Sequence, residues 1–243
     1  MLHVSQTYRI PSLKDSHKGQ RCFVVGNGPS LNGMDLRCLS NEFVIATNYA
    51  FLKEGINTKY LCISDMHRMW ELLHHLDDVV DKLIFYNSHV VPTTRISDIP
   101  PELIDNVVVW QAVKNGIGMS FDLRDPLYCN MEMGSVVFPA IQIAAYMGAT
   151  DVYLIGVDQD YSGSKLWFHD KKGVPHREIG HHGTAEVIGH DYQYSYERQF
   201  KPGIEYMHQL MRDRGLGLFN AGVGGKLDAI PRVEFNSLFG ERG

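Results

Sequence analysis

The sequence predicts an α/β protein built on a Rossmann-like, mainly parallel twisted sheet with helices on both faces. Short apolar runs recur along the chain, and several of them end on a polar residue. Segments with helical spacing separate these runs, which is the pattern of a parallel sheet buried on both faces. Ligands of such sheets bind at the carboxyl ends of the strands. The polar residues that end the runs are therefore the candidates for a functional site.

Composition narrows the class of protein. The 243 residues are 44% hydrophobic and 21% charged, as in ordinary globular proteins, and the net charge of −5 argues against bulk electrostatic binding of nucleic acid. Residues 1–20 hold no apolar run like that of a signal peptide, and no window predicts a transmembrane segment. The four cysteines form no Cys-x-x-Cys pair, and Cys22 and Cys62 lie inside apolar runs, as expected in a reducing compartment. We expect a cytoplasmic protein with an N-terminal extension at 1–20 and one nucleotide-binding domain at 21–239.

The first predicted strand, Cys22 to Val25, stops at Gly26-Asn27-Gly28, and Pro29-Ser30 begins the first turn of a helix. Glycines let backbone N–H groups approach an anion, and a helix N-terminus adds partial positive charge. This stretch therefore predicts a phosphate cradle. It is neither the dinucleotide fingerprint, whose third glycine is Leu31 here, nor a P-loop, because it lacks the lysine. An ordinary strand-to-helix turn explains the spacing equally well.

The other apolar runs predict six more strands and three helices. The strands are expected at 42–48, 59–65, 82–86, 106–110, 151–158 and 217–220, and the helices at 66–80, 134–148 and 192–214. The second helix is apolar nearly all round, so we expect it to pack against the sheet, with Ser135 as N-cap and Gly148 as its C-terminal stop. We expect Pro202-Gly203 to interrupt the third.

Polar residues follow several of these strands. The topology rule brings Gly26–Ser30, Asn48, Asp65 and Asp158 to one edge of the sheet. Three interpretations of Asp158 and Asp160 stay open. The carboxylates hold a divalent cation on phosphates, or Asp158 caps the following loop while Tyr161 offers its hydroxyl to a leaving phosphate, or the segment is an Asp-rich turn.

Residues 159–191 are rich in glycine and histidine and exceed the length of a normal connection, which predicts a lid or binding loop, or disorder. The segment holds five histidines, His169, His176, His181, His182 and His190. It lacks the His-Glu-x-x-His spacing of zinc sites, and adjacent histidines cannot easily share one ion, so we predict no metal site. Most of these histidines fit a solvated loop, and one of them could serve as a general base.

An ordered set of motifs carries a family resemblance. The set is 24–30, 47–48, 134–148, 152–158 followed by Tyr161 and His169, 220–227, and Pro231-Arg232. It resembles the domain shared by archaeal 6-hydroxymethylpterin diphosphokinases and many bacterial proteins of surface-glycan and flagellin-glycosylation clusters. The same core is similar to the family-42 bacterial sialyltransferases, which carry a comparable Gly-Asn-Gly-Pro-Ser loop. The resemblance covers most of residues 20–239.

The resemblance implies a nucleotide site at the carboxyl edge of the sheet. Its nucleotide-binding positions would be Gly26, Asn27, Gly28, Pro29, Ser30, Asn48, Asp65, Gly134, Ser135, Gly156 and Asp158. Tyr161 would support the departing phosphate. The catalytic histidine would be His190, with His169 and His182 as rivals.

Three functions remain open. The first is a sialyltransferase-like glycosyltransferase of bacterial surface-glycan synthesis, which takes a nucleotide-sugar donor, such as a CMP-linked sugar, and a glycan or small-molecule acceptor. A lid rich in His and Tyr suits hydroxyl activation and sugar stacking. The second is pyrophosphoryl transfer from ATP to a pterin, which would use Mg²⁺ with Asp65, Asp158 and Asp160. The third is a nucleotide-binding accessory protein without turnover. The sugar, the acceptor and assembly into a homo-oligomer are left open.

Overall fold

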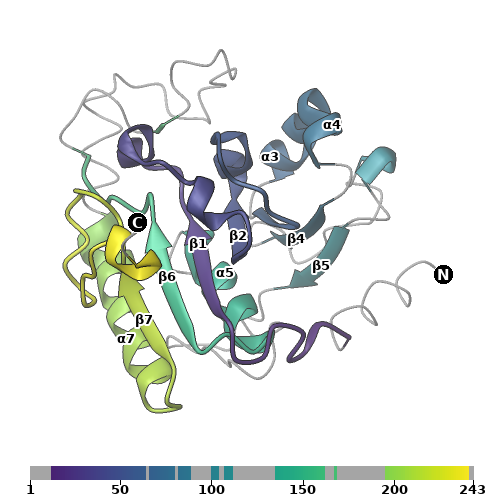
Figure 1. Cartoon of the computed structure of the whole chain (residues 1–243). Coiled ribbons are helices and arrows are strands. Elements are labelled where there is room, and N and C mark those ends of the chain that lie inside the picture. Colours follow the sequence, from purple (N-terminus) through teal and green to yellow (C-terminus); the bar gives the residue numbers. More distant parts are fainter. Residues whose placement is uncertain are drawn as a thin grey trace.

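The computed structural model describes residues 12–63, 66–79, 82–88, 100–103, 107–111, 135–161, 167–168 and 195–240. Seven strands form one sheet in the order β5-β4-β3-β2-β1-β6-β7, and every neighbouring pair is parallel (Figure 1). The strands are β1 (Arg21–Val25), β2 (Phe43–Thr47), β3 (Tyr60–Ile63), β4 (Leu83–Ser88), β5 (Val107–Gln111), β6 (Asp151–Ile155) and β7 (Gly217–Asn220). This is the α/β class that the apolar runs predict.

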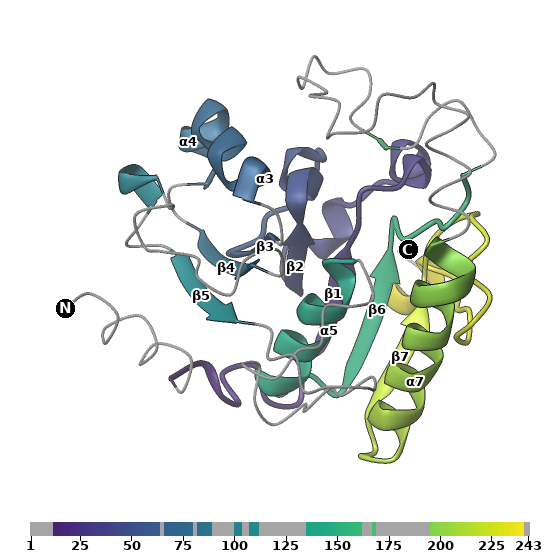
Figure 2. The same cartoon turned by 180° about the vertical axis from the view of Figure 1, so that it is seen from behind.

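The helical segments lie on both faces of this sheet. The α-helices are α3 (Met66–Glu71), α4 (Leu76–Val79), α5 (Val137–Tyr146) and α7 (Lys201–Arg212), and α7 is preceded by a π-helical segment, η9 (Tyr196–Phe200). The 3₁₀ segments are η1 (Pro29–Gly33), η2 (Arg37–Leu39), η3 (Asn48–Leu52), η4 (Leu72–His75), η6 (Pro101–Leu103) and η10 (Asn236–Phe239). Figure 2 shows α5 and α7 together on one side of the sheet.

Alternation along β1 explains why the protein has two cores. Cys22 and Val24 point to the face covered by α5 and α7, whereas Phe23 and Val25 point to the face covered by the 3₁₀ segments and the C-terminal turn. All four side chains are fully buried. A strand buried on both faces reads as a continuous apolar run, which is how β1 stands out in the sequence.

The chain order places a topological switch point between β1 and β6. From β1 the chain moves outward to β5 and then returns to form β6 on the other side of β1. In open parallel sheets the crevice at such a point, outside the carboxyl ends of the strands, is where ligands bind. The loops that begin at Gly26 and at Gly156 leave the sheet there.

Several local predictions are confirmed and others need correction. The seven predicted strands are present, and Gly148 ends the α5 region with a φ of +95°. The N-cap of α5 is Val136 instead of Ser135, although Ser135 Oγ accepts a hydrogen bond from Val137 N (3.3 Å). Pro29-Ser30 opens a five-residue 3₁₀ turn, not a longer helix. Pro202 does not interrupt the third helix, because it lies in the first turn of α7, directly after the π-helical segment η9.

The helices of the described residues are all too short or too polar to cross a membrane. Apart from residues 159–161 and 167–168, the predicted lid lies outside the described part of the chain.

Candidate functional site

The two loops at the switch point pack backbone against backbone. Gly26 N donates to Ile155 O (2.8 Å), and Gly28 N donates to Gly156 O (2.7 Å). A Cβ atom on Gly26 would lie 2.3 Å from Gly156 O, a distance that real Cβ atoms do not reach. The glycine at position 26 is therefore needed for the contact between the loops, whatever ligand they bind.

The carboxylate of Asp158 lies over the loop that follows β1. It accepts hydrogen bonds from Ser30 N (2.8 Å) and Ser30 Oγ (2.5 Å), and a Cβ atom on Gly28 would lie 2.4 Å from its Cγ. Burial raises the pKa of the Asp158 carboxyl, and the two bonds from Ser30 oppose this shift. A phosphate on the Ser30 amide would have to compete with this carboxylate. The geometry therefore does not present Ser30 N as an open phosphate donor.

Asn27 is fixed in orientation by the end of β2. Its Nδ2 donates to Thr47 O (2.8 Å) and to Thr47 Oγ1 (3.2 Å). The Thr47 hydroxyl gives its own proton to Val25 O (2.8 Å), so it can only accept from Asn27. The amide nitrogen of Asn27 must face Thr47, and its Oδ1 faces the other way. That oxygen is buried and accepts no hydrogen bond within the described structure.

Asn48 supplies a second atom of the same kind. It follows β2 directly and has a φ of 48°, in the left-handed region that few non-glycine residues adopt. Its Oδ1 is also buried, and no described group donates to it. A buried acceptor without a partner costs roughly 1–3 kcal/mol. Two such oxygens lie at neighbouring strand ends, and each is a candidate acceptor for a hydrogen-bond donor of a ligand.

Two further features border this edge. Gln159, just after Asp158, has a φ of 52° and accepts a hydrogen bond from Tyr161 Oη (2.8 Å) on its Oε1. Phe168, from the predicted lid segment, is buried and donates its N–H to Asn27 O (2.9 Å). The lid segment thus contacts the loop after β1 at this point.

The predicted site residues fall into two groups. The structure brings together the loop after β1, the end of β2 and the loop after β6, with Gly26, Asn27, Gly28, Pro29, Ser30, Asn48, Gly156 and Asp158. Ser135 lies at the start of α5 and is half-buried. Asp65, Gly134, His169, His182 and His190 lie outside the described residues.

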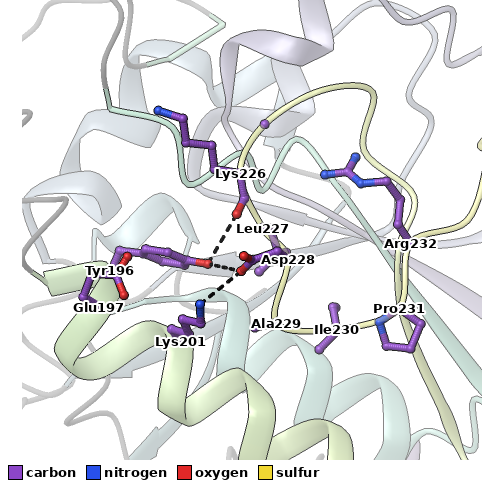
Figure 3. A pocket seen from close by; sticks show the side chains of 11 residues that line it. Tyr196, Glu197, Lys201, Lys226, Leu227, Asp228, Ala229, Ile230, Pro231 and Arg232 are labelled. Carbon is purple, nitrogen blue, oxygen red and sulfur yellow. Dashed lines mark hydrogen bonds and ion pairs between the residues drawn. The ribbon is translucent and has the colours of Figure 1, made fainter.

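A pocket that the sequence did not predict lies beside this edge. It has a volume of about 770 Å³, is open to solvent, and is lined by η9, the start of α7 and the loop after β7 (Figure 3). Its polar centre is Asp228, which accepts a hydrogen bond from Tyr196 Oη (3.1 Å) and forms an ion pair with Lys201 (3.4 Å). Burial and this bond raise the pKa of Tyr196 to about 12, while Tyr196 and Lys201 lower the pKa of Asp228.

The pocket and the switch point share a wall. Lys226 N donates to Asp158 O (2.6 Å), and a Cβ atom on Gly225 would lie 2.6 Å from the same oxygen. Lys226 Nζ also forms an ion pair with Asp160 (2.9 Å). The segment from Asp158 to Asp160 therefore separates the two sites and contacts both.

The same contacts test the magnesium hypothesis. Both oxygens of Asp158 accept hydrogen bonds from Ser30, and Asp160 is paired with Lys226. Magnesium binds carboxylate oxygens with octahedral geometry and would have to compete with these contacts. Within the described residues no three side chains of the metal-binding types come together. Asp158 and Asp160 thus fit a magnesium site poorly in this arrangement.

Comparisons with solved structures support the fold. The chain is similar to the sialyltransferase CstII from Campylobacter jejuni in complex with cytidine-5'-monophosphate, with 14% identity, a TM-score of 0.54 and coverage of 93% of this chain and 88% of that one. It is also similar to the monofunctional α-2,3-sialyltransferase Cst-I from Campylobacter jejuni, with 13% identity and a TM-score of 0.50. That likeness covers 89% of this chain and 82% of Cst-I. At this identity the likeness concerns the fold, which is Rossmann-like as predicted.

Comparison with curated proteins finds no match. A family model described as "6-hydroxymethylpterin diphosphokinase MptE-like" matches residues 2–164, which include the first six strands and both loops of the switch point. The chain therefore belongs to the MptE-like family, as the resemblance of its motifs predicts.

Proposed function

We propose that the protein is a glycosyltransferase that takes its sugar from a nucleotide-activated donor, with the nucleoside of that donor over Asn27 and Asn48. The observation that carries this proposal is the pair of buried, unpaired amide oxygens at the switch point. A ligand must donate hydrogen bonds to them. The hydroxyls of a ribose and the exocyclic amine of cytosine are donors, whereas an ionised phosphate can only accept.

The transfer then follows from general acid–base chemistry. The acceptor hydroxyl loses its proton to a base, its oxygen forms a bond to the anomeric carbon, and the bond from that carbon to the donor phosphate breaks. Hydrogen bonds stabilise the charge that develops on the leaving phosphate. We assign the base to His190, with His169 and His182 as rivals, and the phosphate support to Tyr161. The CMP complex of CstII supports a cytidine donor by analogy of fold.

The family description favours a second candidate, pyrophosphoryl transfer from ATP to a pterin. That reaction depends on magnesium to neutralise the phosphates. The engagement of Asp158 by Ser30 and of Asp160 by Lys226 counts against this candidate. A nucleotide-binding protein without turnover would use the same edge of the sheet.

The test is a calorimetric titration with CMP, UMP, AMP and ATP–Mg²⁺ on the wild type and on Asn48→Gly. Glycine adopts a positive φ without cost, so this variant keeps the backbone and loses only the amide. We expect the affinity for CMP to fall about tenfold or more, which corresponds to one lost hydrogen bond to a buried group. The melting temperature without ligand should stay unchanged or rise.

Asp15→Gly is the matched control, because Asp15 has a similar φ of 57° and lies against the C-terminal end of α5, where its N–H donates to Tyr146 O. It should leave CMP binding as in the wild type. Binding of ATP–Mg²⁺ with no response to CMP would favour the diphosphokinase. If CMP binds but a CMP-sugar is not consumed in the presence of acceptors, the accessory function is favoured.

A further inference from the structure

Arg232 is anchored next to the carboxyl end of β7. The chain folds back there, so that Arg232 forms a parallel bridge with Asn220, the last residue of the strand. Asn220 N donates to Pro231 O (2.8 Å), and Val233 N donates to Asn220 O (2.9 Å). These two bonds fix the backbone on both sides of Arg232. The side chain therefore starts from a rigid point of the sheet edge.

The guanidinium group is held along one edge only. Its Nη1 donates to Gly222 O (2.6 Å) and Gly224 O (2.9 Å). Its Nε and Nη2 donate to no group among the described residues. Lys201 and Lys226, the other cations of the pocket, are paired with Asp228 and Asp160. Arg232 is exposed and lines the same pocket, so its open edge is available to a ligand (Figure 3).

Arg232 is also close to the switch point. The loop of Gly222 and Gly224, which holds the guanidinium, continues into Gly225 and Lys226, which contact Asp158 O. Consistent with this position, the charge of Arg232 lowers the pKa of Asp158 against the effect of burial. The open edge of the guanidinium thus lies at the β7 side of the candidate nucleotide site.

The polar groups along this edge of the sheet change from hydrogen-bond acceptors at β2 to a cation beside β7. In the order β2, β1, β6 and β7, they present the amide oxygens of Asn48 and Asn27, then the carboxylate of Asp158, then the guanidinium of Arg232. Neighbouring strands lie about 4.8 Å apart, so β1 and β7 are separated by roughly 10 Å. The Arg232 backbone lies one position beyond β7, and its guanidinium reaches back to Gly222 O. A nucleotide can lie across this distance with its donor groups at one end and its anionic group at the other.

We propose that Arg232 binds the phosphate of the nucleotide through Nε and Nη2, with the nucleoside over Asn27 and Asn48. This proposal rests on the proposed function and adds a phosphate-binding residue and the direction of the bound nucleotide. The Ser30 amide already carries a carboxylate, so the loop after β1 does not supply the phosphate contact. A guanidinium fork with two open donors matches the geometry of a phosphate.

The experiment compares the affinities of CMP and cytidine by calorimetry. In the wild type CMP should bind more tightly than cytidine. Rising salt concentration should lower the affinity for CMP more than the affinity for cytidine. Arg232→Ala should reduce the affinity for CMP at least tenfold and leave the affinity for cytidine unchanged. The ratio of the CMP affinity to the cytidine affinity should therefore approach one. Arg214→Ala is the matched control, because Arg214 also binds a backbone carbonyl through Nη1, that of Leu210 (3.1 Å). It should keep the ratio of the wild type.

A second variant separates binding from folding. Arg232→Gln keeps an amide donor for Gly222 O and removes the charge, so it should preserve the loop and still lower only the affinity for CMP. An unchanged ratio in both variants would overturn the proposal, and so would equal losses of cytidine and CMP binding in Arg232→Gln. If the wild type binds neither ligand, the proposed function itself fails, a result distinct from a ratio that Arg232 does not change.

Discussion

The two edges of the sheet differ in how their polar groups are satisfied. At the amino edge, Thr58 Oγ1 donates to Val44 O (2.6 Å) and accepts from Tyr60 N (3.0 Å). Arg21 binds Glu42 through Nε (3.0 Å) and Nη2 (2.5 Å). At the carboxyl edge, the Oδ1 atoms of Asn27 and Asn48 are buried and have no donor within the described structure.

The difference separates a structural role from a binding role. Backbone strain alone would not make this distinction. Asn48 and Gln159 at the carboxyl edge have a left-handed φ, but so does Asp15, which lies away from that edge. The pair of unpaired oxygens at adjacent strand ends does make the distinction, since a protein that keeps buried acceptors without donors loses stability that a ligand can restore. We therefore assign stability to the amino edge and binding to the carboxyl edge.

The largest effect is expected for Gly26→Ala. The new Cβ would meet Gly156 O at 2.3 Å, so the loops of β1 and β6 must separate. We expect a loss of roughly 3 kcal/mol in the free energy of unfolding, measured by urea denaturation, and a loss of CMP binding. Gly33→Ala is the control, because a Cβ there meets no atom within 4 Å. A Gly26→Ala protein as stable as Gly33→Ala would show that the loops are not packed in this way.

A smaller effect, confined to stability, is expected for Thr58→Val at the amino edge. Valine has nearly the shape of threonine but leaves Val44 O and Tyr60 N without their partner. The free energy of unfolding should fall by about 2 kcal/mol, while the affinity for CMP, measured by calorimetry, should not change. A loss of CMP affinity as large as that of Asn48→Gly would contradict the assignment of the two edges.

The sequence predicted β1 and β2 well because each is a short apolar run buried on both faces, whereas β7 alternates between half-buried and buried residues. It also predicted that Asn48, Asp158 and the loop after β1 meet, because parallel strands end at a common edge. It could not show that Asp158 binds Ser30, since the two residues are 128 positions apart and either could face solvent. That contact changes the loop from a phosphate cradle into the support of a buried carboxylate.

The pocket beside the switch point was missed for a similar reason. Its walls come from η9, the start of α7 and the loop after β7. Only the loop after β7 belongs to the motif set of the resemblance, and that set assigned no ligand to it. Pro202 was misleading because its effect depends on position, and the π-helical segment that ends at Phe200 places it where a helix tolerates proline. Both outcomes depend on tertiary packing, which periodicity does not encode.

The most direct test of the account is a crystal structure of the wild type with CMP. We predict density for the nucleotide at the carboxyl edge, with hydrogen-bond donors of the nucleoside on the Oδ1 atoms of Asn27 and Asn48. The amino edge offers a competing site, a pocket of about 280 Å³ that includes His17 and Tyr60. Density for CMP there, with both asparagine oxygens left unpaired, would contradict the central claim that the carboxyl edge is the nucleotide site.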